Sequence, residues 1–208
     1  MTGITAPARM SMVFPGSWAN IPLDDDRSME STIAQLVKRQ VGRDDRFAQL
    51  RRDAKQRLLA VARDAQESNA VQLALSLEIL PGVPFPAAVV ADYRNWPDPA
   101  GAGEQTVAQR LATVLPGGEL LELSSGVAIR SFRTTTIRQG TEAVPDIKLE
   151  YFLCVPDGRS LLHVVADVPI KIEAELIAAL FDAMVDSIRW FPAADDTEAD
   201  DTAADTSR

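Results

Sequence analysis

The sequence predicts an α+β fold, in which a mostly antiparallel sheet of about six or seven strands packs against helices and an extra pair of helices lies near the N-terminus. Three observations carry this prediction. Residues 71–79 alternate between apolar and polar, which is the period of a half-buried strand. Four further strand-like runs follow one another after residue 118, and consecutive strands joined by short turns pair antiparallel. Apolar residues at spacings of three and four predict helices before and after these strands.

The first part of the chain predicts one short strand and then two helices. Residues 10–14 form an apolar run that stops at Pro15-Gly16, a turn signal, and this run is the expected first strand. Apolar spacing then predicts two helices between about residues 28 and 67, separated at Gly42. The acids at positions 24–26 precede the first helix, where negative charge complements the helix dipole. A helix start is therefore favoured over a metal site for these three acids.

The second of these helices is rich in basic side chains that lie mostly off its apolar stripe. They could contact an acidic partner, but the acids Asp53, Asp64 and Glu67 are interspersed among them. A solvated face with local ion pairs is therefore the favoured interpretation. The bases concerned are Arg46, Arg51, Arg52, Lys55, Arg57 and Arg63.

The middle of the chain predicts an edge strand, a loop and a short helix. Residues 87–93 are apolar and follow Pro84 and Pro86, and proline is tolerated in sheets mainly at edges, so an edge strand is expected there. The Pro- and Gly-rich residues 95–103 predict a loop. Apolar spacing over 107–115 predicts a short helix, which a Pro-Gly-Gly sequence ends.

The second half of the chain predicts a run of hairpin-connected strands. The strand-like segments are 119–123, 127–137, 147–155 and 161–168. The last two flank Pro156-Asp157-Gly158, which fits a three-residue hairpin loop with Gly in the left-handed position. Such a loop would set Leu153 opposite Leu161, Tyr151 opposite His163 and Leu149 opposite Val165.

The C-terminal part predicts a helix followed by a disordered tail. Apolar residues repeat every three to four positions between 176 and 188, which predicts a long amphipathic helix that runs to Trp190. Residues 193–208 hold six acids, one base and no apolar residue larger than Ala, so they cannot offset the entropy of ordering. We therefore expect a single α+β domain over residues 1–192 and a disordered acidic tail over residues 193–208, with a solubilising role favoured over an interaction role.

Composition and charge exclude several classes of protein. Of the 208 residues, 46% are hydrophobic and 25% are charged, which is ordinary for a globular chain. The net charge of −9 argues against nucleic acid as the main partner, because phosphate binding needs clustered positive charge. No apolar run approaches the roughly 20 residues of a membrane span. The first residues show no secretory signal, so a cytoplasmic location is expected.

The scarcity of cysteine and histidine limits the possible chemistry. The single Cys154 and single His163 exclude a disulfide framework and the usual Cys/His zinc sites. His163 could form a site with Tyr151 and Asp167 on one strand face, but a satisfied histidine on a half-buried sheet is favoured. Strand carboxylates such as Glu150 could act as acid and base without histidine, although the sequence does not place them together. We therefore expect no catalysis, no cofactor and no metal.

Four residues are the candidates for binding a partner. Tyr93 and Trp96 lie at a Pro- and Gly-rich loop with no evident core to join, and aromatic residues and arginine are enriched at protein interfaces. Arg130 and Arg138 share one face of a predicted strand. Two alternatives stay open, namely that Trp96 folds back under the loop and that the strand arginines face water.

Two motifs resemble the PsbP-like superfamily, and the similarity extends over about 180 residues. They are Phe14-Pro15-Gly16-Ser17-Trp18 near the start and Phe181-Asp182-Ala183-Met184-Val185-Asp186-Ser187-Ile188-Arg189-Trp190 near the end. This superfamily includes a Ran-binding nuclear import factor, a photosystem extrinsic subunit and LpqN-type actinobacterial lipoproteins. The resemblance implies a strand that enters a Pro-Gly-Trp-like turn, a meandering sheet and a closing helix. It brings no enzymatic residues.

The chain departs from this pattern in two respects. It shows no lipoprotein signal of the LpqN type, and its helical pair at 28–67 is longer. That pair, with Ile21-Pro22-Leu23-Asp24 ahead of it and Leu50-Arg51-Arg52 within it, looks like a set of uncharacterised actinobacterial proteins, some of them linked to type VII secretion loci.

The function expected from these observations is that of a non-catalytic protein-interaction module. A specific form is an adaptor or chaperone-like accessory of a bacterial, type VII-like secretion system, with a protein as partner. Two alternatives stay open: a small ligand-binding protein or hydrolase that uses carboxylates and His163, and a structural homo-oligomer that associates through its first two helices. A deep pocket at His163 would favour the hydrolase, and a packed His163 would not.

Overall fold

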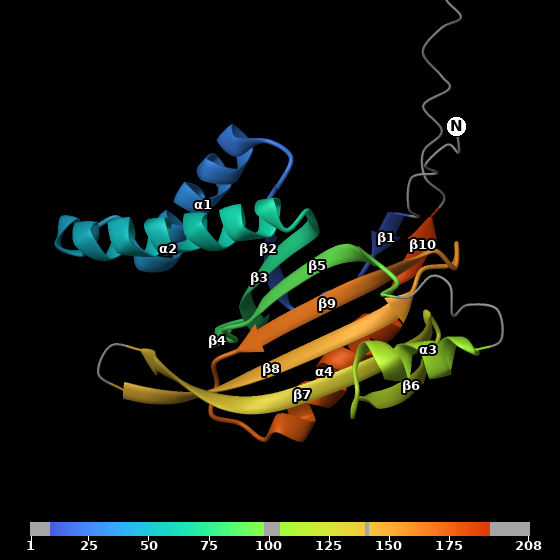
Figure 1. The fold of residues 1–208 in the computed structure, drawn as a ribbon. Coiled ribbons are helices and arrows are strands. Elements are labelled where there is room, and N and C mark those ends of the chain that lie inside the picture. The colour runs from blue at the N-terminus through green and yellow to red at the C-terminus, as the bar shows by residue number, and fades with distance from the viewer. Residues whose placement is uncertain (1–8, 98–104, 140–141, 192–208) are drawn as a thin grey trace, which may run out of the picture.

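The structure, a computed structural model, describes residues 9–97, 105–139 and 142–191 (Figure 1). Within these ranges, helices pack on a large antiparallel sheet, so the predicted α+β class is confirmed. The helices are α1 (Asp26–Val41), α2 (Ala48–Glu67), α3 (Val107–Val114) and α4 (Ala174–Asp186), with a 3-10 turn η1 (Asp45–Phe47) before α2. The strands are β1 (Arg9–Ser11), β2 (Ser17–Asn20), β3 (Ala70–Leu80), β4 (Val83–Pro84), β5 (Ala88–Asn95), β6 (Glu119–Leu123), β7 (Gly126–Gln139), β8 (Glu142–Cys154), β9 (Ser160–Val168) and β10 (Arg189–Phe191).

The main sheet has eight strands, and its order is β2-β3-β5-β9-β8-β7-β6, with β4 paired to β3 outside this path. The short β1 and β10 form a separate two-stranded sheet. The strands β2 and β4 were not expected, because four and two residues are too short to show a period in the sequence. The domain boundary predicted at residue 192 and the tail at 193–208 lie outside the described residues.

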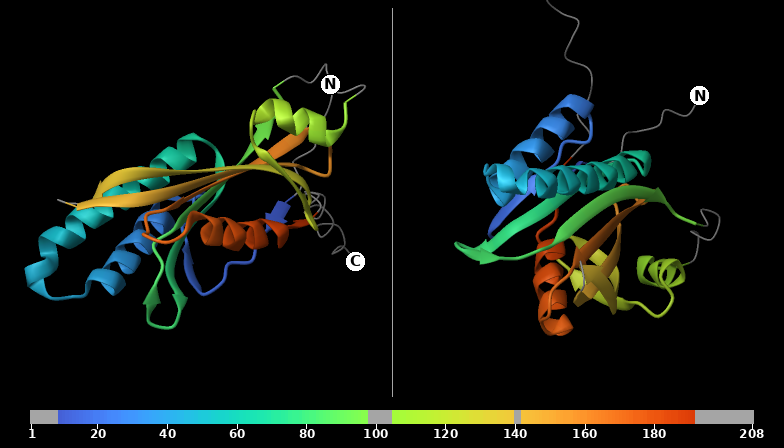
Figure 2. Two further views of the ribbon diagram at one scale, coloured as in Figure 1. Left: turned by 90° about the horizontal axis from the view of Figure 1, so that it is seen from below. Right: turned by 90° about the vertical axis from the view of Figure 1, so that its left-hand side faces the viewer.

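Helices cover both faces of the main sheet (Figure 2). On one face, α4 packs through Phe181, Met184 and Val185 against strand residues such as Leu149 and Tyr151. The other face carries two separate apolar clusters, one under α1 and α2 and one under α3. Successive strand side chains point to opposite faces, so each strand supplies both layers. The strip of sheet between the two clusters is the part of this face where polar side chains gather, as described below.

The helices α1 and α2 form a hairpin that is attached to the sheet at one end. Near the sheet, Met29 and Ile33 of α1 are buried against Ala62 and Ala65 of α2. Those two alanines are the only buried residues that α2 contains, although this helix is 20 residues long. The tip of the hairpin, around η1, therefore projects beyond the sheet, at the left of Figure 1.

The predicted edge strand is instead a central one. Strand β5 lies between β3 and β9, and it pairs with both along most of its length. The prediction failed because the prolines lie before the strand: Pro84 ends β4 and Pro86 follows it, so neither removes a donor from the β5 ladders. The edge position that tolerates proline belongs to β4.

The structure also corrects the elements predicted at the two ends of the chain. The expected strand at 10–14 is shifted to β1 at residues 9–11, and the final helix stops at Asp186 instead of Trp190. Trp190 lies in β10, opposite Met10 of β1. The two ends of the described chain therefore pair with each other, a long-range contact that helical spacing cannot reveal.

The β8–β9 hairpin has a register one residue away from the predicted one. Leu153 faces Leu162, Tyr151 faces Val164, and it is Phe152 that lies opposite His163. The loop has four residues instead of three, because the Val155 amide donates to the Ser160 carbonyl at 3.0 Å. A shift of one residue exchanges the faces of a strand, so Tyr151 and His163 lie on opposite sides of the sheet.

Gly16 allows β2 to approach β3 closely. Its φ is +82°, and a Cβ at this position would lie 2.2 Å from the Glu78 carbonyl oxygen. Gly117 has nearly the same φ, +80°, but a Cβ there would meet nothing within 4 Å. The two glycines therefore separate the cost of a left-handed backbone from the cost of a steric clash.

We expect Gly16→Ala to lower the free energy of unfolding by more than Gly117→Ala, which should cost only the roughly 1–2 kcal/mol of a left-handed L-residue. Urea denaturation of both variants measures the difference. Equal losses would show that the approach of β2 to β3 relaxes without cost.

Candidate functional site

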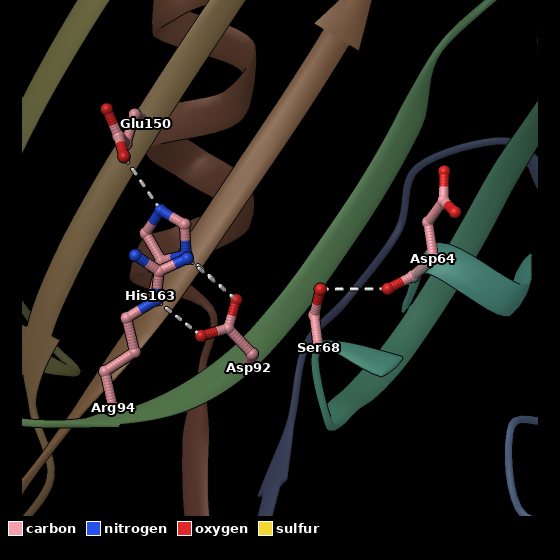
Figure 3. Close-up of polar contacts among 6 residues, drawn as sticks. All are labelled: Asp64, Ser68, Asp92, Arg94, Glu150 and His163. Carbon is pink, nitrogen blue, oxygen red and sulfur yellow. Dashed lines mark hydrogen bonds and ion pairs between the residues drawn. The ribbon is translucent and has the colours of Figure 1, made fainter. Parts of the chain in front are cut away.

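A row of polar side chains crosses three central strands between the two apolar clusters. Asp92 of β5 lies directly opposite His163 of β9, and His163 lies opposite Phe152 of β8. Glu150, two residues before Phe152, points to the same face because strand side chains alternate. Figure 3 shows the side chains of Asp92, Glu150 and His163 together with Arg94 of β5. The antiparallel order β5-β9-β8 thus gathers residues that lie far apart in the sequence.

Both nitrogens of the His163 ring are bound by carboxylates. Nδ1 lies 2.9 Å from Oδ2 of Asp92, and Nε2 lies 2.9 Å from Oε1 of Glu150. The ring is only 3% exposed, and it stacks on Phe152 with 4.5 Å between the ring centroids. The ring can donate a hydrogen bond to each of the two carboxylates only when both of its nitrogens carry a proton. His163 therefore ties β9 to β5 and to β8.

His163 and Arg94 hold Asp92 in its carboxylate form. Burial acts to raise its pKa, but the hydrogen bonds from His163 and Arg94 and the charges of those groups outweigh burial and hold the pKa below its ordinary value. The bond from Arg94 Nε to Oδ1 measures 2.8 Å. With a partner on each of its oxygens, Asp92 fulfils the requirement for burying a charge.

This row has part of the geometry of a hydrolase, but the second ring nitrogen of His163 does not face a hydroxyl or thiol of the described residues. An Asp–His pair can orient an imidazole as a general base, provided that the second ring nitrogen faces a hydroxyl or thiol. In His163 that nitrogen faces the Glu150 carboxylate. The hydroxyl of Ser68, drawn in Figure 3, donates to the Asp64 carbonyl at 2.8 Å instead. Asp92, Glu150 and His163 line neither the groove described below nor the three other cavities found among the described residues near the hairpin and β1–β3.

The site suggested by the sequence, His163 with Tyr151 and Asp167, is not assembled. Tyr151 faces α4, where its hydroxyl donates to Asp182 at 2.8 Å, and burial together with Asp182 raises its pKa. Asp167 accepts from Lys148 at 2.8 Å. Cys154 packs beside the cluster under α3, and burial raises the pKa of its thiol. No three ligating side chains of the described residues converge to hold a metal ion.

The four candidate partner-binding residues do not form one surface. Trp96 is buried under α3, where the Arg110 guanidinium lies 3.7 Å from its ring centroid, so the alternative of folding back is the one observed. Tyr93 is half-buried on the opposite face. Arg130 is buried and pairs with Asp182 and Glu119, on the α4 side of the sheet.

Arg138 alone of these four is exposed, near the far end of β7. It lies eight residues from Arg130, which is roughly 26 Å along an extended strand. Of the two alternatives for Trp96, the interface position is not the one observed, because α3 supplies an apolar cover for the indole, centred on Leu111, that the loop composition did not indicate.

A groove that sequence reasoning missed lies between the helical hairpin and the sheet. It encloses about 690 Å³, and α1, α2, β3, β8 and β9 all contribute to its walls. Apolar side chains form most of the lining. They include Val37 and Val41 of α1, Ala54 and Leu58 of α2, Leu75 and Leu77 of β3, and Phe85 and Ile137. In both Figure 1 and the left view of Figure 2, the hairpin and the β7–β8 ribbon extend in the same direction beyond the rest of the sheet.

The charged side chains at the groove, one lysine and two carboxylates, already pair with one another. Lys148 donates to Asp167 at 2.8 Å and lies 3.5 Å from Asp146, which is buried. The hydrogen bond to Asp167, opposed by partial burial and reinforced by the charges of both carboxylates, raises the pKa of Lys148. The ammonium therefore remains charged and paired, and the groove offers an apolar surface more than a polar one.

The first prediction from this site concerns pH. Because the pKa of Asp92 is lower in the folded chain than in the unfolded chain, its carboxylate contributes stability above the unfolded pKa, and this contribution is lost as the pH falls through the folded pKa. We expect the free energy of unfolding to decrease between about pH 5 and pH 2, and to decrease less in Asp92→Asn. Urea titrations at several pH values measure the two slopes. Asp64→Asn, at an exposed helical position, should keep the native slope, and a native slope in Asp92→Asn would contradict the assignment.

The second prediction concerns coupling within the row. His163→Leu leaves Asp92 buried with Arg94 alone, so we expect it to cost about 3–5 kcal/mol of stability. In the double variant with Asp92→Leu, the uncompensated charge is gone, and the loss should be smaller than the sum of the two single losses. Urea denaturation of the four proteins of this cycle gives the coupling free energy, and strict additivity would contradict a direct interaction.

Comparisons with known proteins do not identify a family for this chain. No family model matches the chain, and no curated protein matches it either. The PsbP-like resemblance therefore stays a prediction that rests on the two short motifs. Of the helices in the described residues, none combines the length and apolar character that crossing a membrane requires.

Proposed function

We propose that this chain is a non-catalytic protein-interaction module, and that the groove between the helical hairpin and the sheet receives an apolar segment of a protein partner. The observation that carries the proposal is the groove itself, with its apolar lining and its volume of about 690 Å³. Apolar surface left open to water costs free energy that a partner can recover by covering it.

A protein segment fits the lining better than a small polar substrate does. Sites for small molecules combine an apolar wall with a few convergent polar groups that fix orientation. Here the charged side chains in the wall, Lys148, Asp146 and Asp167, already bind one another. Two helices and a sheet face form the remaining walls, and such walls receive the apolar side chains of a peptide in helix-in-groove recognition.

The state of His163 supports the non-catalytic part of the proposal. Its ring is buried, and both of its nitrogens are bound by carboxylates, so it has no lone pair directed at a substrate. The more specific role of an adaptor or chaperone-like accessory in a secretion system stays a prediction from the sequence resemblance.

We expect a photo-cross-linking amino acid at Leu58, inside the groove, to form one defined adduct with a protein in cells that express the full chain natively. The same amino acid at Leu176, which is 59% exposed on α4, should form none. A charge on the groove floor, Leu77→Lys, should abolish the Leu58 adduct while the circular dichroism spectrum stays native. Mass spectrometry identifies the adduct.

Two results would contradict this proposal. Equal adducts from Leu58 and Leu176 would show that contact is not directed by the groove. An adduct with a second copy of the chain would show that the groove binds another copy of this chain and not a different protein. Light scattering would then confirm the homo-oligomer.

A further inference from the structure

The charge of the chain is divided unevenly between the helical hairpin and the rest. Residues 38–63 contain nine bases and three acids, whereas the remaining residues contain twelve bases and 27 acids. A chain with a net charge of −9 thus carries a strongly basic segment, and this segment comprises the end of α1, η1 and most of α2.

Most of these bases are not neutralised within the described residues. Two ion pairs form, Arg46 with Asp44 at 3.0 Å and Arg63 with Glu30 at 3.7 Å. Of the local ion pairs expected on this solvated face, only Arg46 with Asp44 forms among the described residues, because Arg63 pairs with Glu30 of the other helix. Seven bases between residues 38 and 57 have no ion pair with a described carboxylate: Lys38, Arg39, Arg43, Arg51, Arg52, Lys55 and Arg57.

Six of these bases adjoin the apolar groove, and we call them the basic border: Lys38, Arg39, Arg43, Arg51, Arg52 and Lys55. They line two depressions, one on the hairpin and one that also includes Ala19 of β2, and Lys38 and Arg43 belong to both. Leu36 lies in the wall of the groove and of one depression, and Val37 lies in the wall of the groove and of the other. An occupant of the groove would therefore extend onto unpaired positive charge.

This arrangement selects the charge of the occupant. A cluster of like charges is repulsive until a partner supplies the opposite sign, and complementary charge also accelerates encounter. The rest of the chain is acidic, so an acidic segment is repelled elsewhere and attracted to the hairpin. A nucleic acid would match the charge, but its backbone offers no apolar side chains to fill the groove.

We propose that the groove receives an acidic, amphipathic peptide segment, whose apolar side chains enter the groove while its Asp and Glu side chains pair with the basic border. This inference rests on the proposed function, because it defines the segment that the interaction module recognises. The acidic residues 193–208 of the chain itself match the charge, but they contain no apolar residue larger than Ala and so lack the anchors that the groove needs.

The experiment uses the full chain and a fluorescein-labelled peptide of about 18 residues, designed as a helix with Leu on one face and Glu on the other. Three matched peptides replace Glu by Gln, Glu by Lys, or Leu by Ser. We expect the Leu/Glu peptide to bind at least tenfold more tightly than each of the other three in fluorescence anisotropy. Raising the NaCl concentration from about 50 to about 500 mM should weaken its binding at least fivefold, because salt screens exposed charges.

Variants of the chain locate the binding. Arg43→Glu/Lys55→Glu should weaken binding of the Leu/Glu peptide at least tenfold. The matched control Arg9→Glu/Arg159→Glu makes the same change of charge at β1 and at the β8–β9 turn, away from the hairpin tip in Figure 1, and should change the affinity less than twofold. Circular dichroism checks that both variants keep the native fold.

The results separate this inference from the proposed function. Equal affinities for the Gln and Glu peptides would overturn the acidic preference and leave the groove as a docking site. Equal affinities for the Leu and Ser peptides, together with no effect of Leu77→Lys, would overturn both. If deletion of residues 193–208 raised the affinity for the Leu/Glu peptide tenfold, the basic border would bind the chain's own acidic segment. That result would overturn the proposal that a segment of another protein binds there.

Discussion

The register of the central strands β5, β9 and β8 is the constraint on which the rest of the structure depends. Because strand side chains alternate between faces, one register places Tyr151 and Val164 under α4 and sends Phe152 and His163 to the other face. A shift of β9 by one residue would bury His163 under α4 and remove Leu162 from the cluster there. The two helical layers can pack only on the register that the structure has.

The polar row fixes this register more strictly than apolar burial alone. Asp92, His163 and Glu150 can form their two 2.9 Å contacts only when β5, β9 and β8 are aligned as observed. A slipped alignment would leave a buried charge without a partner, which costs more than an imperfect apolar contact. The row thereby separates the cluster under the hairpin from the cluster under α3, and it gives the chain specificity of strand pairing.

Local patterns in the sequence predicted most of the elements, and failures occurred where distant residues decide. Strand β6 was predicted at its observed bounds, and the alternation in β3 and the spacing in α1, α2 and α4 were sufficient to identify these elements. The β8–β9 register depended on the difference between a three- and a four-residue loop, which Pro-Asp-Gly does not settle. The partner of His163 was missed because Asp92 is 71 residues away, although a single acid within the apolar run of β5 was a signal for it.

The helical hairpin is the part of the fold that stability alone does not explain. Only two alanines of this 20-residue helix are fully buried, and Ala54, Leu58 and Leu59 pack against the core in part, while propensity alone leaves a helix marginal in water. The bases along its outer half repel one another, which lowers its stability further. Nevertheless, this segment holds the apolar wall of the groove formed by Ala54 and Leu58. A partner that covers this wall and supplies negative charge would reduce the exposed apolar surface and the charge repulsion together, so the hairpin would gain stability on binding.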